Sequence, residues 1–371
     1  MEERGESDED QARMSLRDPL PATSERCLPA QRLTEFARAI FVRAGVAEQD
    51  AATVAEVLVW ANLRGVDSHG VIRIPSYLEY IASGRMNPRA RISVLRQTAA
   101  TASIDADRAL GAVATVAAMR LAMDKARQAG IGWTVVRNVT HQGALGYYAL
   151  MAAEAGMAGL VNTSGTPVMA PYGARAPGVH NSPVALCVPA RRHPPLLLDM
   201  AHSVAAGGKI KLAADAGLAI PADWALDAAG EPTTDPERAR ILLPLGGPKG
   251  SGVAILFECL SSLMACNPIL AREIPAMLGG AGREHTQNSI VAAIDIAAFT
   301  GLDDYRDDVD RLVDALRTLP PAAGHAEVCV PGERGHRTSE ARARNGIPMP
   351  PGTVERLQAV ADALGLPFPV E

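Results

Sequence analysis

The sequence lacks the short motifs that mark the common nucleotide-binding folds and hydrolases. No GxGxxG pattern follows an expected strand, which argues against a Rossmann dinucleotide site. The phosphate-loop pattern GxxxxGK, the zinc-protease pattern HExxH and the nucleophile pattern GxSxG are absent as well. The histidines show no spacing typical of metal ligands, so we predict no structural or catalytic metal.

Features that favour a membrane or a nucleic acid as partner are also scarce. The chain has 371 residues, of which 48% are hydrophobic, 21% charged and only 4% aromatic. That balance is typical of a globular protein whose core is built from Ala, Leu and Val. The formal net charge of −5 gives no electrostatic reason to expect nucleic acid or an anionic membrane. The longest apolar run, residues 252–266, is too short to span a bilayer and contains Glu258, so we expect a buried helix there.

The cysteines indicate a cellular compartment, and residues 1–27 indicate where ordered structure starts. The five cysteines are scattered and form no CxxC pair, which favours reduced thiols in the cytoplasm. Residues 1–10 are acidic, unlike the start of a secretory signal. Residues 1–27 show almost no apolar periodicity, so we expect a disordered extension, with ordered structure beginning near Leu28.

Helices and strands alternate along the rest of the chain without a regular βαβ period, which indicates a mixed α/β or α+β protein. Apolar residues have helical spacing from Leu33 and again from Ala52. We expect further helices over 114–128, 303–317 and 353–364, and strands over 132–139, 157–165, 183–190, 194–201, 289–299 and 326–335, the last of these ending in a turn.

The segment RGVDSHGVIRIPSY, residues 64–77, gathers polar and charged side chains around two glycines and a proline. Proline is tolerated in the first turn of a helix and is costly later, so Pro75 predicts a helix that starts near residues 72–74. Ser68 and His69 then lie in the loop before it, and His69 lies near the positive end of the helix dipole. The segment predicts a short pocket wall that faces an anion.

Two further residues of this segment suggest a substrate. Arg73 and Tyr77 are four apart and share a face at the helix start. Arg73 suits bidentate pairing with a carboxylate, and its alternative is an ordinary surface salt bridge. Tyr77 suits a hydrogen bond to substrate, and its alternative is packing in a helix interface.

Other candidates for chemistry lie at the ends of expected elements. His141 ends a strand and, with His69, is a candidate acid–base group because histidine titrates near neutrality; the alternative is a structural histidine. Asp199 follows the apolar run LLL, and a carboxylate after a buried strand needs a partner, such as a histidine or a cofactor. Lys249 in GGPKGSG precedes an expected helix and suits a phosphate or ribose, or is a solvated turn lysine.

Taken together, several segments resemble the type-2 malate/L-lactate dehydrogenase family, which includes ureidoglycolate and sulfolactate dehydrogenases and reductases of cyclic imino acids. The resemblance runs from about Leu33 to about Leu366. It rests on RGVDSHGVIRIPSYLEYIASG, VVRNVTHQGALGYYALMAAEAGM, LLLDMAHSVAAGGKI, IPADWALDAAGEPTTDP, LPLGGPKGSGVA, VPGE and NGIPMP.

This resemblance implies a mixed α/β fold that binds NAD or NADP without a Rossmann domain, on a largely antiparallel sheet. Residues 28–100 would begin a helical substrate and dimerisation domain. Residues 101–325 would form the nicotinamide-binding domain, with a helical insertion near 205–250, and residues 326–371 would return to the first domain. The resemblance also implies a homodimer with its active site in a cleft between domains.

Residue roles follow from the matching segments. The resemblance implies that His141 exchanges the proton, with His69 as the second catalytic histidine, and that Ser68, Arg73 and Tyr77 bind substrate. The residues that match cofactor contacts are Asp199, Met200, Ala201, Lys249, Pro331, Gly332 and Glu333, together with a serine or threonine of NTSGT (162–166), for which Ser164 is the candidate.

Three departures from the family pattern bear on the substrate. His202 replaces a small Ser or Thr, PYGA (171–174) replaces a double glycine, and HNSP (180–183) replaces an Asn-Asn-Pro or Thr-Asn-Pro segment. The first hypothesis is a dehydrogenase of a small 2-oxo or 2-hydroxy acid. The second is a reductase of cyclic imino acids, for which NADPH is favoured. The third is a binding protein without turnover, against which the retained His69, Arg73, His141 and Lys249 argue.

Overall fold

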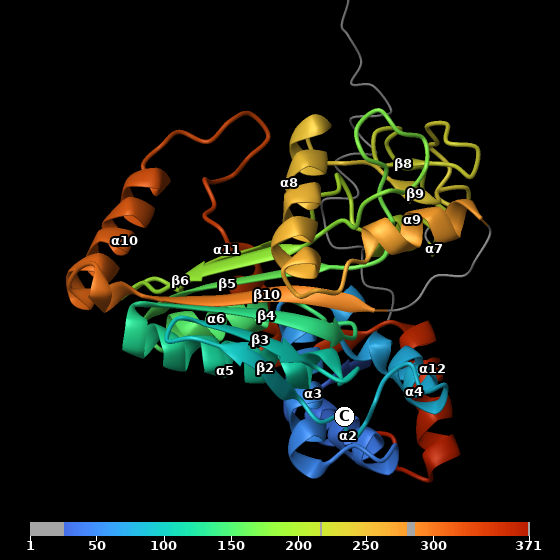
Figure 1. Cartoon of the computed structure of the whole chain (residues 1–371). Coiled ribbons are helices and arrows are strands. Elements are labelled where there is room, and N and C mark those ends of the chain that lie inside the picture. Colours follow the sequence, from blue (N-terminus) through green and yellow to red (C-terminus); the bar gives the residue numbers. More distant parts are fainter. Residues whose placement is uncertain (1–25, 216, 280–285, 370–371) are drawn as a thin grey trace, which may run out of the picture.

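A seven-stranded sheet forms the centre of the protein (Figure 1). The computed structural model describes residues 26–215, 217–279 and 286–369. Within these ranges the strand order is β2-β3-β4-β10-β5-β6-β7, and every neighbouring pair except β3–β4 is antiparallel. The strands are β2 (Ser93–Gln97), β3 (Thr101–Asp105), β4 (Ile131–Val139), β5 (Met157–Ser164), β6 (Val184–Val188), β7 (Leu196–Met200) and β10 (Gln287–Asp295). The expected mixed α/β fold on a largely antiparallel sheet is confirmed.

Two helices cover one face of this sheet (Figure 1). Helix α5 (Gly111–Ala129) packs on β4 and β10, and α6 (Gly146–Glu154) packs on β5 and β6. Helix α5 is rich in alanine, which has the highest helix propensity, and it ends at Gly130 in the left-handed conformation. Its buried alanines and methionines form one continuous stripe, so the apolar face sets the position of the helix on the sheet.

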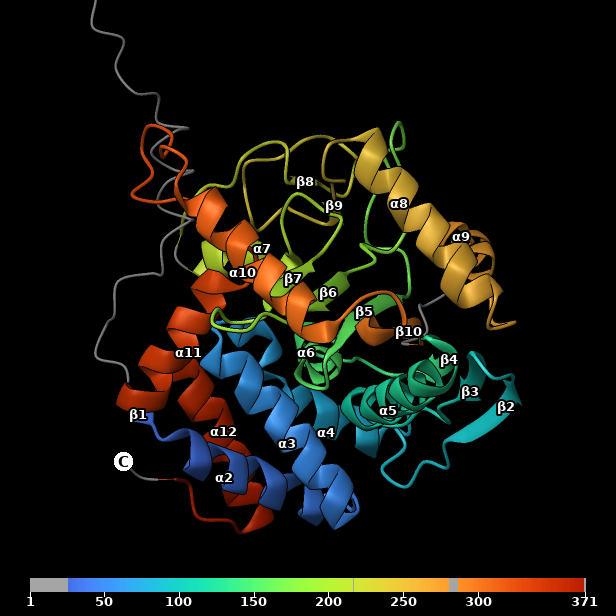
Figure 2. The same ribbon diagram turned by 90° about the vertical axis from the view of Figure 1, so that its left-hand side faces the viewer.

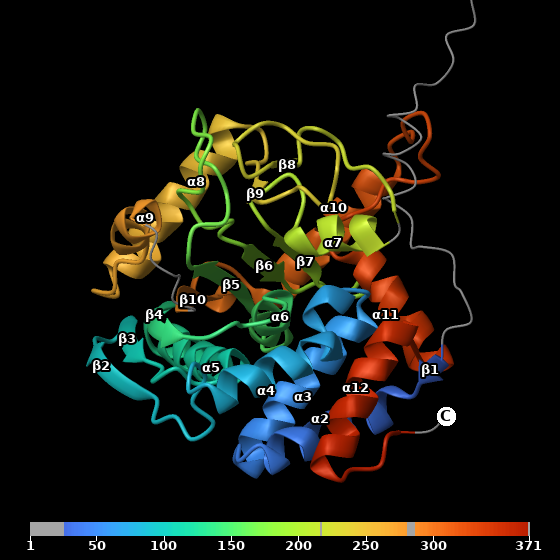
Figure 3. The same cartoon turned by 90° about the vertical axis from the view of Figure 1, so that its right-hand side faces the viewer.

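The N-terminal and C-terminal segments build one helical layer beside the sheet (Figures 2 and 3). Strand β1 pairs antiparallel with β11, and α12 packs on α2 and α4 while α11 packs on α3. One hydrophobic core runs from this layer into α5 and α6. The elements are β1 (Arg26–Leu28), α2 (Ala30–Arg43), α3 (Glu48–Leu63), α4 (Ile74–Ala82), α11 (Glu333–Asn345), β11 (Ile347–Met349) and α12 (Pro351–Leu364).

The opposite face of the sheet carries a smaller group of elements. Helix α8 contacts β5, and the π-helical turn η3 contacts β4, β5 and β10. Helix α10 lies at the far edge (Figure 1), where Asp310 accepts backbone N–H bonds from Arg191, Arg192 and His193. The elements are α7 (Gly207–Asp215), β8 (Ala225–Leu226), β9 (Ile241–Leu242), α8 (Pro248–Glu258), η3 (Cys259–Leu263), α9 (Leu270–Leu278) and α10 (Leu302–Arg317).

The structure corrects two expectations and bears on a third. The strand over 326–335 is wrong: this segment is irregular, and α11 begins at Glu333 because its carboxylate pairs with Arg317 and Arg337. The run 252–266 is helical as expected but not buried, since Leu256 is 63% exposed. Strand β1 starts at Arg26 and pairs with β11, close to the expected start of ordered structure near Leu28, and residues 1–25 of the expected extension lie outside the described residues.

Three further features of the described residues concern membrane helices, metal ligands and thiols. None of the helices found there combines the length and the apolar character needed to cross a membrane. The same residues contain no group of three or more His, Cys, Asp or Glu side chains arranged to hold a metal ion. The five cysteines are all free thiols.

One prediction links the packing of α5 to the candidate catalytic histidine. A Cβ at Gly111 would lie 2.2 Å from the His141 carbonyl oxygen and 2.7 Å from Gln142 Cα. We expect Gly111→Ala to lower the free energy of unfolding by about 1–3 kcal/mol, because the crowded backbone must shift. Urea denaturation measures this change. In the control Gly252→Ala the new Cβ meets no atom within 4 Å, so stability should not fall; an unchanged Gly111→Ala would contradict the prediction.

Candidate active site

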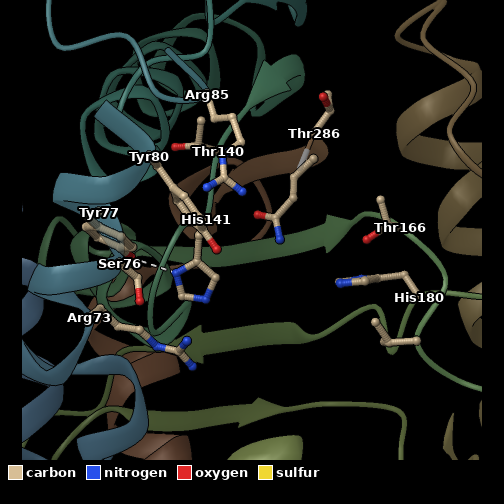
Figure 4. A pocket seen from close by; sticks show the side chains of 12 residues that line it. Arg73, Ser76, Tyr77, Tyr80, Arg85, Thr140, His141, Thr166, His180 and Thr286 are labelled. Atoms are coloured by element: carbon tan, nitrogen blue, oxygen red, sulfur yellow. Dashed lines mark hydrogen bonds between the residues drawn. The ribbon is translucent and has the colours of Figure 1, made fainter. Parts of the chain in front are cut away.

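Two cavities meet where the helical layer faces one end of the sheet. The larger is a cleft of about 860 Å³. The smaller, of about 210 Å³, opens beside it and is shown in Figure 4. Both are lined by Arg73, His141, Val168, His180 and Gln287. The junction therefore brings together residues from five separate parts of the chain.

The loop that precedes α4 forms one wall and is held from two sides. Asn62 Nδ2 donates to Asp67 Oδ1 at 2.6 Å, and Asn62 Oδ1 accepts the Val71 N–H at 2.9 Å. Arg342 of α11 grips the same Asp67 carboxylate with two hydrogen bonds of 2.7 and 3.0 Å. Asp67 thus acts as an anchor for the loop, and the neighbouring Ser68 and His69 line the cleft.

Arg73 is positioned at the start of α4, as the proline predicts. Helix α4 begins at Ile74, with Pro75 in its first turn. Arg73 Nε donates to the Ser68 carbonyl at 2.6 Å. Its terminal nitrogens Nη1 and Nη2 have no hydrogen-bond partner among the described residues. The guanidinium therefore presents a free two-pronged donor edge where the two cavities meet, a geometry that matches a carboxylate.

His141 lies beside Arg73 and is paired with Tyr77 (Figure 4). The Tyr77 hydroxyl and His141 Nδ1 are 2.7 Å apart. Tyr77 is 4% exposed, and its burial raises the pKa of the phenol well above its usual value, so it stays protonated near neutral pH. When Tyr77 donates this bond, the proton of a neutral His141 resides on Nε2.

His69 is held differently from His141, although the two rings stack with centroids 5.5 Å apart. Its Nδ1 lies 3.0 Å from the Ser68 hydroxyl. Burial, and then the nearby charge of Arg73, lower the pKa of His69 to about 4. His69 is therefore neutral over the physiological range and suited to hydrogen bonding rather than to donating a proton.

Two residues that sequence reasoning missed complete the junction. His180 Nδ1 accepts the Ser182 N–H at 3.1 Å, and burial lowers the pKa of His180 to about 4, so its neutral ring carries the proton on Nε2. Figure 4 shows it across the cavity from His141. The buried Oε1 of Gln287 has no hydrogen-bond partner among the described residues. Neither was named as a site residue from the sequence, although His180 opens the HNSP segment that departs from the family pattern, because both reach the site through tertiary packing.

The larger cleft contains the candidate cofactor segment that follows β7. Asp199, Met200 and Ala201 all line it. Asp199 Oδ2 accepts the Gly146 N–H at 2.7 Å. Desolvation by the surrounding protein raises the pKa of Asp199 to about 6. The hydrogen bond from Gly146 and the charge of Arg64 offset part of this rise. The carboxylate remains accessible to solvent and to a ligand in the cleft.

The chain is similar over most of its length to proteins of one known family. The family model described as malate/L-lactate dehydrogenase matches residues 28–358. The chain belongs to this family. A malate dehydrogenase from Pyrococcus horikoshii is 34% identical over 358 residues, covering 91% of this chain and 96% of that protein. The resemblance seen in the sequence is confirmed, and the chain is a dehydrogenase rather than a binding protein without turnover.

Solved structures agree with the assignment. A malate dehydrogenase structure from Pyrococcus horikoshii superposes with a TM-score of 0.85 at 32% identity, covering 95% of this chain and 99% of that one. A Δ1-piperideine-2-carboxylate reductase from Pseudomonas syringae gives a TM-score of 0.80 at 29% identity, covering 91% and 100%. The fold is therefore shared by relatives named for different substrates.

A dehydrogenase of this family implies a nicotinamide cofactor, and the cleft has groups that fit one. The N-terminus of α7 lines it through Gly207, Gly208 and Lys209, a combination that suits a phosphate. A Cβ at Gly208 would lie 2.9 Å from Ser68 Cβ, so glycine permits α7 to approach the loop. The unpartnered Gln287 Oε1 at the inner end fits an amide N–H donor.

Several expected cofactor residues do not line either cavity. Side chains alternate along β5, so Thr163 lines the cleft while Ser164 points away, fully buried, and accepts from Ser261 Oγ at 2.8 Å. Lys249 is exposed at the start of α8. Two segments carry a glycine pair shortly before a lysine, GGK (207–209) and GGPK (246–249). Of the two lysines, Lys209 lines the cleft.

The turn at 331–333 also has a structural place in this geometry. Pro331 accepts the Leu197 N–H at 3.1 Å, and Gly332 accepts from Arg64 at 3.0 Å. Glu333 is buried and pairs with Arg317 at 2.8 Å. These residues lie beside β7, the last strand of the sheet, and do not line either cavity.

His202, the departure from the family pattern, is not at the junction either. It is 7% exposed, and its Nδ1 donates to the Ser182 carbonyl at 2.6 Å. It therefore fixes the backbone that follows His180 rather than facing a cavity.

The raised pKa of Asp199 predicts a pH dependence of stability. Its folded value of about 6 lies above the unfolded value, so the folded chain binds more protons between about pH 4 and pH 6. The contribution of Asp199 to stability therefore falls as pH rises through this window and is least favourable above it. We expect Asp199→Asn, which can still accept the Gly146 bond, to lose this fall and to be relatively more stable at neutral pH.

Urea denaturation at several pH values measures the effect. Asp124→Asn is the control, because Asp124 is an exposed carboxylate paired with Arg127 at 2.7 Å. If the curves of Asp199→Asn and of the unmodified protein stay parallel from about pH 4 to pH 7, Asp199 is an ordinary solvated carboxylate.

Proposed function

We propose that the chain is an NAD- or NADP-dependent dehydrogenase acting on a small 2-oxo or 2-hydroxy acid, at the carbon next to the carboxylate. The single observation that carries this proposal is the free terminal edge of Arg73, which lies beside the Tyr77–His141 pair where the two cavities meet. A substrate carboxylate on Arg73 brings the adjacent carbon toward His141 and the larger cleft. Positioning of this kind converts a bimolecular step into an effectively intramolecular one.

The larger cleft would hold the cofactor. Asp199, Met200 and Ala201 would contact it along one side, the N-terminus of α7 would take a phosphate, and Gln287 Oε1 would accept from the carboxamide. When bound, the nicotinamide supplies or accepts the hydride. A fluorescence titration with NADH and with NADPH measures which of the two cofactors the chain binds.

His141 would exchange the proton on the reacting oxygen. In the reducing direction a protonated His141 would give its Nε2 proton to the oxygen and become neutral, with the remaining proton on Nδ1 donating to the Tyr77 oxygen 2.7 Å away. In the oxidising direction Nε2 accepts the hydroxyl proton while Nδ1–H donates to Tyr77. His69, neutral because of its lowered pKa, would hydrogen-bond the substrate and orient it.

A reductase of cyclic imino acids is the second candidate. It is favoured by the structural similarity to the Δ1-piperideine-2-carboxylate reductase. Such a substrate also carries a carboxylate for Arg73 but can arrive with its nitrogen already protonated, so the acid matters less. NADPH is the favoured cofactor for this candidate.

We also propose that two copies of the chain associate. Apolar side chains on α8 and η3 are exposed, an arrangement that often marks an interface; they are Ile255, Leu256, Leu260, Leu263 and Met264. The family resemblance implies a homodimer, and light scattering of the purified chain measures its mass. The free cysteines favour a reducing compartment such as the cytoplasm.

The function is tested with a panel of 2-oxo acids and cyclic imino acids, each assayed with NADH and NADPH, and with a fluorescence titration of both cofactors. We expect Arg73→Lys to raise the KM for the active carboxylate substrate about tenfold or more, because lysine lacks the bidentate edge. The cofactor Kd should change little. An unaltered KM would remove Arg73 from substrate binding, and a panel without turnover would overturn the proposed function.

The histidine roles predict different pH profiles of kcat for a 2-oxo acid. His141→Asn should lose the acid–base limb, because His141 Nε2 is the group proposed to exchange the proton with the reacting oxygen. His69→Asn should keep that limb, since the pKa of His69 is already lowered to about 4. If the limb disappears only in His69→Asn, the two roles are exchanged; if it persists in both variants, another group carries the proton.

A further inference from the structure

Two departures from the family pattern, His202 and the HNSP segment, form one hydrogen-bonded unit that ends where the two cavities meet. His202 Nδ1 donates to the Ser182 carbonyl at 2.6 Å, and the Ser182 N–H donates to His180 Nδ1 at 3.1 Å. We propose that this unit directs the Nε2–H of His180 to the carboxamide oxygen of the nicotinamide, while Gln287 Oε1 accepts from the carboxamide nitrogen. This inference rests on the proposed function and names residues that orient its cofactor.

The unit is held rigidly because its members are buried and bonded to one another. Ser182 is 1% exposed and His202 is 7% exposed. Ser182 has a φ of 35°, a left-handed conformation that residues other than glycine rarely adopt and that needs support from its surroundings. The backbone N–H of His202 donates to the Asn181 carbonyl at 2.8 Å, in addition to the bond from its ring to Ser182. His202 therefore supports two consecutive residues of the segment that follows His180.

The bond from Ser182 determines which nitrogen of His180 carries the proton. Because Nδ1 accepts an N–H, the neutral ring has its proton on Nε2. Burial lowers the pKa of His180 to about 4, and a contact with the Thr163 backbone offsets part of this lowering. The ring is thus a neutral donor at neutral pH. One N–H is commonly shared between two acceptors, so the contact with Thr163 does not prevent Nε2 from donating to a ligand oxygen as well.

Gln287 lies close to His180 because both pack against a glycine. A Cβ at Gly165 would lie 3.3 Å from Gln287 Cγ and 3.3 Å from His180 Nε2, so any larger residue there would press on both side chains. The buried Oε1 of Gln287 has no hydrogen-bond partner among the described residues. A neutral donor and an unpartnered acceptor therefore lie against the same glycine. A primary amide is complementary to such a pair, because it offers one oxygen acceptor and N–H donors.

The location of the pair favours the cofactor, rather than the substrate, as the source of the amide. His180 and Gln287 line both cavities, as do Arg73 and His141. Hydride transfer requires the nicotinamide to reach this junction from the larger cleft. His180 lies across the smaller cavity from His141 (Figure 4). A carboxamide bound on the His180 side leaves the side of His141 and Arg73 for the substrate.

The experiment measures by calorimetry, without substrate, the Kd of two reduced cofactors. They are NADH or NADPH, whichever the protein binds, and its 3-acetylpyridine analogue, which keeps the carbonyl oxygen but has a methyl group in place of the amide nitrogen. We expect the unmodified protein to bind the analogue about fivefold more weakly, the effect of one hydrogen bond between neutral groups. Gln287→Met should weaken the natural cofactor about fivefold and the analogue little. His180→Phe should weaken both about fivefold, because both carry the oxygen.

His202 is a positioning residue that acts through Ser182, and its variants provide a second test. His202→Leu removes the ring donor and should weaken both cofactors about as much as His180→Phe. The double variant should show no further loss, because the two residues belong to one unit. His202→Asn keeps a donor and should retain most of the affinity. The matched control is His325→Phe, since His325 is exposed and lines neither cavity.

Three outcomes would overturn the amide-binding pair. The first is an equal Kd for the two cofactors in the unmodified protein, and the second is a Gln287→Met variant that weakens both equally. The third is an unchanged cofactor Kd in His180→Phe together with a raised KM for the substrate, which would place His180 on the substrate side. Failure of the proposed function would differ from all three, because the unmodified protein would then bind neither NADH nor NADPH.

Discussion

The grip of Asn62 and Arg342 on Asp67 is the interaction on which the site depends. Arg342 lies 275 residues after Asp67 in the sequence, yet it binds both oxygens of that carboxylate. This contact ties helix α11 to the loop that holds Ser68 and His69. Because Arg73 is held by the Ser68 carbonyl at 2.6 Å, the position of the substrate-facing guanidinium follows from the same anchor.

Burial and hydrogen bonding give the three histidines at the junction different roles. His69 and His180 have lowered pKa values and are neutral, so they serve as fixed hydrogen-bonding groups. His141 alone of these three is paired with a buried tyrosine hydroxyl. In the smaller cavity, which His141 and His180 line, the charged side chains are Arg73 and Arg85. The site thus combines neutral, oriented hydrogen-bonding groups with cations that can bind acidic substrates.

Local sequence signals predicted the elements that depend on local physics. Pro75 located the start of α4, and apolar runs located β4, β5 and β10 within a few residues. The strand expected over 326–335 failed because the fate of that segment depends on the pairing of Glu333 with Arg317, 16 residues away. The run 252–266 was expected to be buried because apolarity alone does not say which face of a helix the fold covers.

By itself the sequence determined the family, the helix start at Pro75 and the association of Ser68, His69, Arg73 and Tyr77, because these lie within one short segment. Only the tertiary structure decided that Lys209 rather than Lys249, and Thr163 rather than Ser164, line the cleft. It alone brought His180, Gln287 and Arg85 to the same junction as His141. The physical reason is that strand alternation and long-range packing, rather than residue type, decide which side chains face a common cavity.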